Sequence, residues 1–329
     1  IPDETGKLQS VAYNPVGFGS PHAAFFEVSP FNITYHDLTV HPVTKTAFVS
    51  LSMSGKDGDQ SALVMVPPQG EIANLDYQTL IYTSVDIAEP ADPSVTFWRD
   101  ISAPTLSVTD FEYDGGQLYV ACLSNGEFAS TLRTISYPFD ASVETTSIEM
   151  FHTAHNQNET RAPIRAMAMV DLDGEKTMVA AYTCTPLVTI PVDALDDGAH
   201  VVGNTVAELG YGNRPLEVLS LTAYNMERQP EQFVLVINRE MSANLIKLED
   251  LAAAPALTEP FAALGDTLGV DGTHIPFAGI LQADDQDAQF ILTLRRNIDT
   301  GDVDLISSMK GVYFRLSDFV SEYTFPDYT

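Results

Sequence analysis

Apolar and polar residues alternate in short runs along most of the chain, and polar turns separate the runs. The stretch 105–125 is the simplest example: an alternating run that ends at Tyr113 meets Asp114-Gly115-Gly116, and apolar residues resume at Leu118. Alternation with a period of two is typical of a strand that buries one face, and a glycine-rich turn joins two such strands. The stretch therefore predicts a β-hairpin.

The same order of elements recurs: an apolar strand, a polar turn, a second strand, a short loop, a third strand and a weaker fourth strand. Five copies are identified, with first strands marked by Leu38, Phe111, Met169, Leu219 and Ile280. Their separations of 73, 58, 50 and 61 residues each suit one four-stranded blade with its loops. Helical periodicity is confined to 193–200 and 247–255. The pattern predicts an all-β protein, a β-propeller of four-stranded antiparallel blades.

Less regular stretches complete the expected blades. We expect fourth strands at 79–87 in the first copy and at 259–264 in the fourth copy, and a third strand at 311–319 in the fifth copy. The chain offers no clear fourth strand after Phe319. The N-terminal stretch 22–31 is therefore expected to pair into the last blade, which would close the ring and remove two exposed sheet edges.

This repeat order resembles that of the bacterial β-propellers grouped as quinoprotein-like or lactonase-like repeat proteins. The resemblance covers nearly the whole chain, and we expect residues 1–329 to form a single propeller domain. It rests on repeat order alone, because no copy has a Trp-Asp ending, a kelch glycine pair or the docking motif of quinone-dependent dehydrogenases. The resemblance implies a fold but no activity. Five blades are identified, 88–104 leaves six or seven open, and a pair of β-sandwiches is the alternative architecture.

The charge balance excludes some partners. The chain has 16 Lys and Arg residues against 45 Asp and Glu residues, a net charge of −29. Such a surface repels phosphate backbones, so nucleic acid and anionic membranes are poor partners. No apolar run approaches the roughly 20 residues that span a bilayer. The charge suits cations, a basic partner protein or solubility in salt.

The start of the chain and its cysteines bear on location. Ile1-Pro2 lacks an initiator methionine, as a mature secreted or periplasmic protein would after signal-peptide removal, although a trimmed chain would look the same. Cys122 and Cys184 are the only cysteines. They fit either one disulfide, as in an oxidising compartment, or two buried thiols, and the sequence leaves both open.

A ligand site is expected at the mouth of the propeller channel, which the first strands line. The segments that lead into these strands carry the candidate ligand-binding residues Tyr35, His36, Asp37, Asp110, Arg161, Arg165, Arg214, Glu217 and His274. Three of these are arginines in a chain with only ten, so they would form a cationic spot that binds a carboxylate or phosphate bidentately. Alternatively, the arginines and acids pair with one another and plug the channel.

Metal sites follow from two further patterns. The histidine pairs His36/His41 and His152/His155 have spacings that point the two side chains to opposite faces of an extended strand, so neither pair is expected to chelate. A histidine metal site would require distant residues such as His36 and His274 to converge. Calcium is the cofactor considered, because acidic turns place hard oxygen ligands close together. The candidate calcium ligands are Asp57, Asp59, Asp284, Asp285 and Asp287.

The sequence favours a secreted or periplasmic binding or scaffold module that recognises a small anionic ligand or a partner protein at the channel mouth. The alternative is a hydrolase or lyase that acts on a small ester, lactone or saccharide there, with a bound cation. No nucleophile elbow, phosphate loop or zinc-protease motif is present, so whether the protein is an enzyme stays open. An enzyme would need His36 or His274 within hydrogen-bond reach of a carboxylate in an open pocket.

Overall fold

The structure is a computed structural model. It describes residues 18, 29–55, 58–68, 72–76, 79–97, 101–139, 142–210, 214–225, 227–260, 267–275, 277, 279–297 and 299–310. The chain divides into two compact units. The first unit comprises Ile1–Leu80, Leu221–Glu231 and Ile275–Thr329, and the second comprises Ile81–Ser220 and Gln232–His274. The expectation that 1–329 is one domain stays a prediction.

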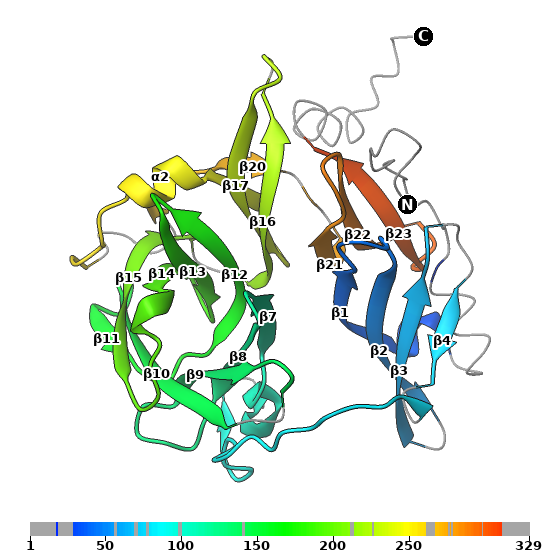
Figure 1. Cartoon of the computed structure of the whole chain (residues 1–329), viewed down its shortest axis with the longest axis horizontal. Helices are drawn as coiled ribbons and strands as arrows, with labels where there is room; N and C mark the ends of the chain where they lie inside the picture. The colour runs from blue at the N-terminus through cyan, green and yellow to red at the C-terminus, as the bar shows by residue number, and fades with distance from the viewer. Residues whose placement is uncertain are drawn as a thin grey trace. The chain divides into compact units, whose positions relative to one another are not determined.

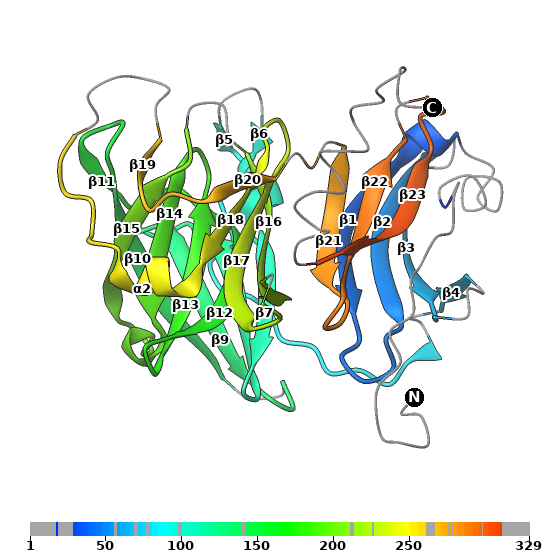
Figure 2. The same ribbon diagram turned by 90° about the horizontal axis from the view of Figure 1, so that it is seen from above.

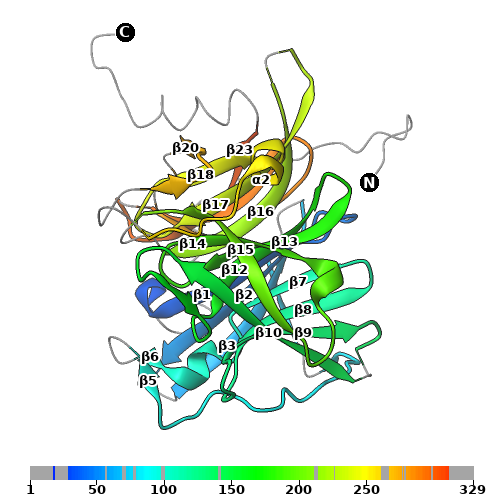
Figure 3. The same cartoon turned by 90° about the vertical axis from the view of Figure 1, so that its left-hand side faces the viewer.

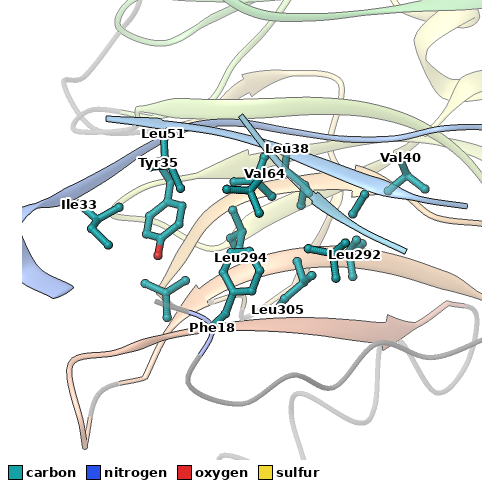
Figure 4. Close-up of a cluster of buried hydrophobic side chains, with 14 of the residues drawn as sticks. Phe18, Ile33, Tyr35, Leu38, Val40, Leu51, Val64, Leu292, Leu294 and Leu305 are labelled. Carbon is teal, nitrogen blue, oxygen red and sulfur yellow. The ribbon is translucent and has the colours of Figure 1, made fainter. Parts of the chain in front are cut away.

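Two antiparallel sheets build the first unit (Figure 2). One has the order β1 (Ile33–Val40), β2 (Ala47–Gly55), β3 (Gly58–Val66) and β4 (Ala73–Leu75), and the other has the order β21 (Ile280–Asp285), β22 (Phe290–Arg296) and β23 (Val303–Met309). Alternate residues of each sheet meet in one core, where Leu51 and Val64 face Leu292 and Leu294 (Figure 4). Phe18, which is 1% exposed, packs into the same cluster.

A long sheet forms most of the second unit (Figures 1 and 3). Its order is β12-β13-β14-β15-β10-β9-β8-β7, with β11 added to β10 and β19 added to β15. The strands are β7 (Asp110–Asp114), β8 (Gln117–Leu123), β9 (Ser130–Ser136), β10 (Val143–His152), β11 (Gln157–Glu159), β12 (Ile164–Leu172), β13 (Glu175–Tyr182), β14 (Pro186–Pro191), β15 (His200–Glu208) and β19 (Leu268–Gly269). Two antiparallel runs of four strands, β7–β10 and β12–β15, are joined where β10 pairs parallel to β15.

Acidic side chains on β7 bring the two ends of this sheet together. Asp110, Glu112 and Asp114 alternate along β7 and therefore share one face. Asp110 accepts a hydrogen bond from the backbone N–H of Met167 on β12 at 2.7 Å, and Asp114 lies 3.1 Å from the ammonium of Lys176 on β13. The sheet is thereby nearly closed and barrel-like, because side chains bridge the gap that backbone pairing leaves.

The strands β12–β15 are buried on both faces. Met167, Met169 and Met178 pack inward against β8, β9 and β10, while the alternate residues Ala168 and Val179 pack outward. The outward face is covered by β16 (Pro215–Tyr224), β17 (Pro230–Asn238) and β18 (Ala243–Lys247), with the helix α2 (Leu248–Ala253) beside them, and β20 (Thr273–Ile275) is the neighbour of β18. These four strands form a sheet of their own.

Short elements complete the description. A two-stranded hairpin is formed by β5 (Thr96–Phe97) and β6 (Ile101–Ser102), and single 3-10 turns occur at η1 (Pro30–Asn32), η4 (Ala103–Leu106) and η5 (Val192–Ala194). None of the helices among the described residues has the length and apolar character that a membrane crossing requires.

The structure confirms the predicted all-β class and the hairpin at 105–125, where Gly115 and Gly116 take the positive φ angles of +58° and +90° that the turn requires. The fourth strand expected at 79–87 is wrong, because Ala73–Leu75 takes that place beside β3. The fourth strand beside β18 is β20, and part of the stretch expected instead, 261–264, lies outside the described residues.

The last copy also differs from its prediction. The strand beside β22 is β23, whose apolar residues Val303 and Leu305 alternate with acids, whereas 311–319 lies outside the described residues. Residues 22–28 of the expected closing strand lie outside them as well. Pro30 opens a 3-10 turn at the end of that stretch, because its fixed φ suits the first position of a helical turn.

Candidate functional site

β-bulges interrupt the first strands of three sequence copies. The pairing register shifts at His36 in β1, at Arg165 in β12 and at Leu281 in β21. A bulge adds one residue to one strand and re-aims its side chain. In β1 it leaves the consecutive residues His36 and Asp37 both exposed, so the simple alternation expected from the sequence fails at this point.

Arg165, in the bulge of β12, is the most unusual of the expected ligand-binding residues. It is half-buried, yet it makes no hydrogen bond or ion pair with any residue that the structure describes. Burial is the main cause that lowers the pKa of the Arg165 guanidinium, and the nearby charges of Arg239 and Arg214 lower it further. Asp110 acts in the opposite direction. The guanidinium thus carries a charge that its surroundings only partly balance.

Asp110, the acid whose charge acts on Arg165, also makes a hydrogen bond that joins two strands. Its carboxylate accepts the backbone N–H of Met167 at 2.7 Å and helps to bring β7 beside β12. Among the described residues Arg165 forms no ion pair with Asp110, although the charge of Asp110 acts on it, whereas Arg214 and Arg239 pair with Glu240, so the expected plug stays a prediction. Glu217 itself is half-buried on β16.

Arg214 and Arg239 form a more exposed pair beside this position. The N–H of Arg239 donates to the carbonyl of Arg214 at 2.9 Å, which holds the two backbones together. Both guanidinium groups share Glu240, whose Oε1 lies 3.6 Å from Nε of Arg214 and 4.0 Å from Nε of Arg239. Among the described residues, the charges that act on the Arg165 guanidinium are thus two arginines, Arg214 and Arg239, and one acid, Asp110.

The other expected mouth residues have separate surroundings. Tyr35 is 8% exposed and packs in the core of the first unit, so it does not line a ligand site, because the bulge follows it and leaves it on the buried face. The ring of His36 hydrogen-bonds to the hydroxyl of Ser52 at 2.7 Å, and that of His274 to the hydroxyl of Ser242 at 3.1 Å. Asp37 caps the N–H of Leu38 at 2.8 Å.

Arg161 lines a separate cavity of about 230 Å³ in the second unit. The cavity is also lined by Asp92, Ser124 and Asn125, and Arg161 is exposed there. A larger cavity of about 310 Å³ lies between β12–β15 and the segment around α2, lined by Asp173, Glu175 and Asn204 among others. Its acidic lining does not suit an anion.

The expected calcium ligands are engaged with the protein itself. Asp284 accepts the N–H of Val40 at 2.6 Å, Asp285 forms an ion pair with Lys310, and Asp287 accepts the N–H of Gln289 at 2.7 Å. Burial raises the pKa of Asp284 to about 6. Asp59 bonds the hydroxyl of Ser54, and Asp57 lies outside the described residues. Calcium binding stays a prediction.

The structure brings together one histidine pair that the sequence spacing had separated. His152 ends β10 and His155 lies in the following turn, so the rule that places them on opposite faces of an extended strand does not apply. Their ring centroids lie 4.1 Å apart. With Glu159 they form a group whose ligand atoms all lie within 4.8 Å of one another. Burial lowers the pKa of His152, against the charges of Glu208 and Glu159. The prediction for this pair applied to an extended strand, and the turn that follows His152 removes that condition.

The cysteines are both free thiols. Cys122 is buried on β8, whereas Cys184 is exposed in the turn after β13, with a φ of +86°. Of the two alternatives left open by the sequence, the structure supports free thiols rather than a disulfide, although only Cys122 is buried.

Comparison with known proteins identifies no family for this chain. No family model matches the sequence, and no curated protein matches it. Among solved structures, the chain is similar to a protein described as a bifunctional GH43-CE from Bacteroides eggerthii, with 12% identity and a TM-score of 0.34. The match covers 91% of this chain and 34% of that one, so the chain spans about a third of its length. A likeness of this size establishes neither fold nor activity.

Proposed function

We propose that this protein is a binding module that holds a small anionic ligand at Arg165. The supporting observation is a half-buried guanidinium that makes no hydrogen bond or ion pair with the described residues and whose charge Asp110 only partly balances. A guanidinium keeps its charge at any ordinary pH, and a charge removed from water requires a partner. A carboxylate or phosphate group supplies two acceptors that match its planar fork.

The charge of the whole molecule limits the size of that ligand. With a net charge of −29 the surface repels polyanions, so a nucleic acid or an extended acidic polymer does not suit the site. Arg214 and Arg239 raise the local potential around Arg165 only over a short range in salt. A small molecule that carries one or two carboxylates, or a phosphate, fits this arrangement.

We further propose that the strands are arranged as propeller blades. The support is the repeated four-strand order: β1–β4, β7–β10 and β12–β15 each run antiparallel, β16–β18 with β20 form a further set of four strands, and β21–β23 supplies three antiparallel strands. In such an arrangement the bulged first strands would line the channel, with Arg165 at its mouth.

The alternative, a hydrolase or lyase at the same mouth, lacks a supporting observation. It would need His36 or His274 beside a carboxylate, but in the described part of the chain both rings bond to serine hydroxyls. Neither has a carboxylate partner there. The anion-binding proposal therefore stands on the better observation.

A binding experiment tests the proposal. Citrate and inorganic phosphate are titrated into the full-length protein at constant ionic strength, with sodium chloride as the reference salt, and binding is followed by calorimetry. Loss of a charge-assisted bidentate contact in Arg165→Met should weaken binding about tenfold or more.

Arg161→Met is the matched control, because it removes one exposed arginine of the same unit and changes the net charge equally. It should alter binding by no more than about twofold, as expected for a solvated charge. Equal affinity of Arg165→Met and the unmodified protein for both anions would refute the proposal.

A further inference from the structure

A second polar cluster lies on the hairpin of β10 and β11, at the same edge of the long sheet where β15 ends and β14 begins. His152 is the last residue of β10, and Glu159 is the last residue of β11. The turn between them carries His155, whose Nδ1 lies 2.7 Å from Oε1 of Glu159. Nδ1 of His152 lies 3.7 Å from the same oxygen. Two imidazole nitrogens and one carboxylate oxygen thus face a common point.

A buried carboxylate holds the inner histidine. Glu208, at the end of β15, is 2% exposed, and its Oε1 accepts the N–H and the hydroxyl of Thr153, both at 2.9 Å. Its Oε2 accepts the hydroxyl of Thr185. The ring of His152, also 2% exposed, places Nε2 at 3.2 Å from the oxygen of Thr185 and 3.8 Å from Oε2 of Glu208.

This network assigns the proton of His152. The hydroxyl of Thr185 gives its hydrogen to Glu208, so its oxygen is an acceptor toward the ring. Nε2 of His152 is then the protonated nitrogen, and Nδ1 carries a lone pair. That lone pair points toward Glu159, which is also an acceptor. Oε1 of Glu159 accepts a hydrogen bond from Nε2 of Gln157 at 3.0 Å and lies 2.7 Å from Nδ1 of His155, so a metal ion here would take the place of a proton on His155 and also bind the lone pair of His152.

We propose that His152, His155 and Glu159 bind a divalent transition-metal ion of the zinc class, and that Thr185 and Glu208 position His152 for it. Metal-binding histidines usually donate their second ring N–H to a carboxylate or another acceptor, the arrangement that Thr185 and Glu208 provide. This site is independent of the anion site at Arg165.

The donor set and its geometry select the metal. Two imidazoles and one carboxylate suit zinc, whereas calcium prefers six or more oxygen ligands. Ligand atoms bound to zinc at about 2.0–2.2 Å in a tetrahedron lie roughly 3.3 Å apart. The distances of 2.7 Å and 3.7 Å lie on either side of that value, so small side-chain shifts suffice. His155 is 55% exposed, which leaves a side open to water or a further ligand.

The test uses full-length protein freed of metal by dialysis against a chelator. Zinc is titrated in competition with a chromophoric chelator, and cobalt is added separately to record its visible spectrum. We expect one zinc per chain and an intense tetrahedral cobalt spectrum. All variants carry Cys184→Ser, because that exposed thiol lies in the same turn as Thr185 and would bind zinc on its own.

His155→Ala removes an exposed ligand and should weaken zinc binding about tenfold or more without loss of the fold. Glu208→Gln removes the buried partner of Thr185 and should weaken it about 10- to 100-fold. His200→Ala is the matched control, since His200 is a partly exposed histidine 3.4 Å from Glu149 in the same unit, and it should leave affinity unchanged.

Melting of each metal-free variant verifies its fold. The proposal is overturned if His155→Ala and Glu159→Gln bind zinc as the parent protein does. It is also overturned if His200→Ala abolishes binding, or if the site takes calcium in preference to zinc.

Discussion

Lys310 in the first unit and His152 in the second unit are both almost completely buried, and both lie among carboxylates. The ammonium of Lys310 pairs with Asp285 and donates to the carbonyl of Asp287 at 2.6 Å. Gln286 beside it accepts the hydroxyl of Ser307 at 2.6 Å. The buried ammonium is therefore satisfied by an ion pair and a hydrogen bond within the protein, which is what a structural network requires.

Around the His152 ring, hydrogen-bond donors and acceptors are matched on the Nε2 side only. Its Nε2 side is held by Thr185 and Glu208, but its Nδ1 side faces the acceptor oxygen of Glu159. Arg165, in the same unit, shows the opposite imbalance, because its cation is without a paired anion among the described residues. This difference indicates where ligands bind. A closed network, in which each buried charge has a partner within the protein, supports the fold. An open network, in which a charge or an acceptor is left unmatched, indicates the kind of ligand that would bind there.

The largest effect is expected from the closed network. Lys310→Met leaves Asp285 without its cation in a partly buried position, so the free energy of unfolding should fall by about 3–5 kcal/mol. Urea unfolding measures the change. The double variant with Asp285→Asn should recover much of the loss. If the free energy of unfolding fell by less than about 1 kcal/mol, this pair would resemble a weak surface ion pair, and Lys310 could no longer serve as the structural counterpart of His152.

Zinc should stabilise the second unit through the open cluster. A ligand that binds only the folded state at 100 times its dissociation constant adds about 2.7 kcal/mol to the free energy of unfolding. At the same zinc concentration, a His155→Ala variant that binds zinc tenfold more weakly should gain only about 1.4 kcal/mol. Calorimetric melting with and without zinc gives the answer, and an equal shift in both proteins would indicate binding elsewhere.

Asp284 makes the stability of the first unit depend on pH. Its pKa of about 6, against a usual 3.8, means that the folded state holds the proton more tightly than the unfolded state. Stability from this group is therefore gained as the pH falls through 6 and lost as it rises. Between pH 7 and pH 5 the gain should be about 1.3 kcal/mol.

Asp284→Asn removes that titration while it keeps the size of the side chain. The difference in unfolding free energy between the original protein and this variant should grow by the stated amount from pH 7 to pH 5. A difference that does not change with pH would show that Asp284 is ionised throughout this range, and the charge balance of the first network would need revision.

Arg165→Met should have the smallest effect on stability. The methionine keeps the apolar packing of the stem, and no ion pair among the described residues is broken, so the change should stay within about 1 kcal/mol. Urea unfolding of Arg165→Met and of Lys310→Met compares the two losses in unfolding free energy directly. If both variants lose several kcal/mol, Arg165 is a structural cation, and the contrast between the two units disappears.

The alternation of apolar residues was sufficient to predict the β-class and most hairpins, because a period of two is a local property. The bulges at His36 and Arg165 were not predictable in this way, since one extra residue hardly changes an apolar pattern. The third strand of the last copy was expected at 311–319, although the alternation of Asp302 and Asp304 with Val303 and Leu305 marks strand β23.

The histidine cluster was missed for a different reason. Whether His152 and His155 converge depends on where β10 ends, and strand ends are poorly determined by sequence. The polar run from Asn156 to Asn158 was the available signal for a turn. Thr185 and Glu208 come from distant strands, and only the sheet register brings them to His152.

Crystals grown with sodium selenate and measured at the selenium absorption edge test the central claim most directly. We expect an anomalous peak within hydrogen-bond distance of the Arg165 guanidinium, at a position that is empty in crystals of Arg165→Met. A guanidinium paired with a carboxylate of the chain, with no selenium beside it, would contradict the account.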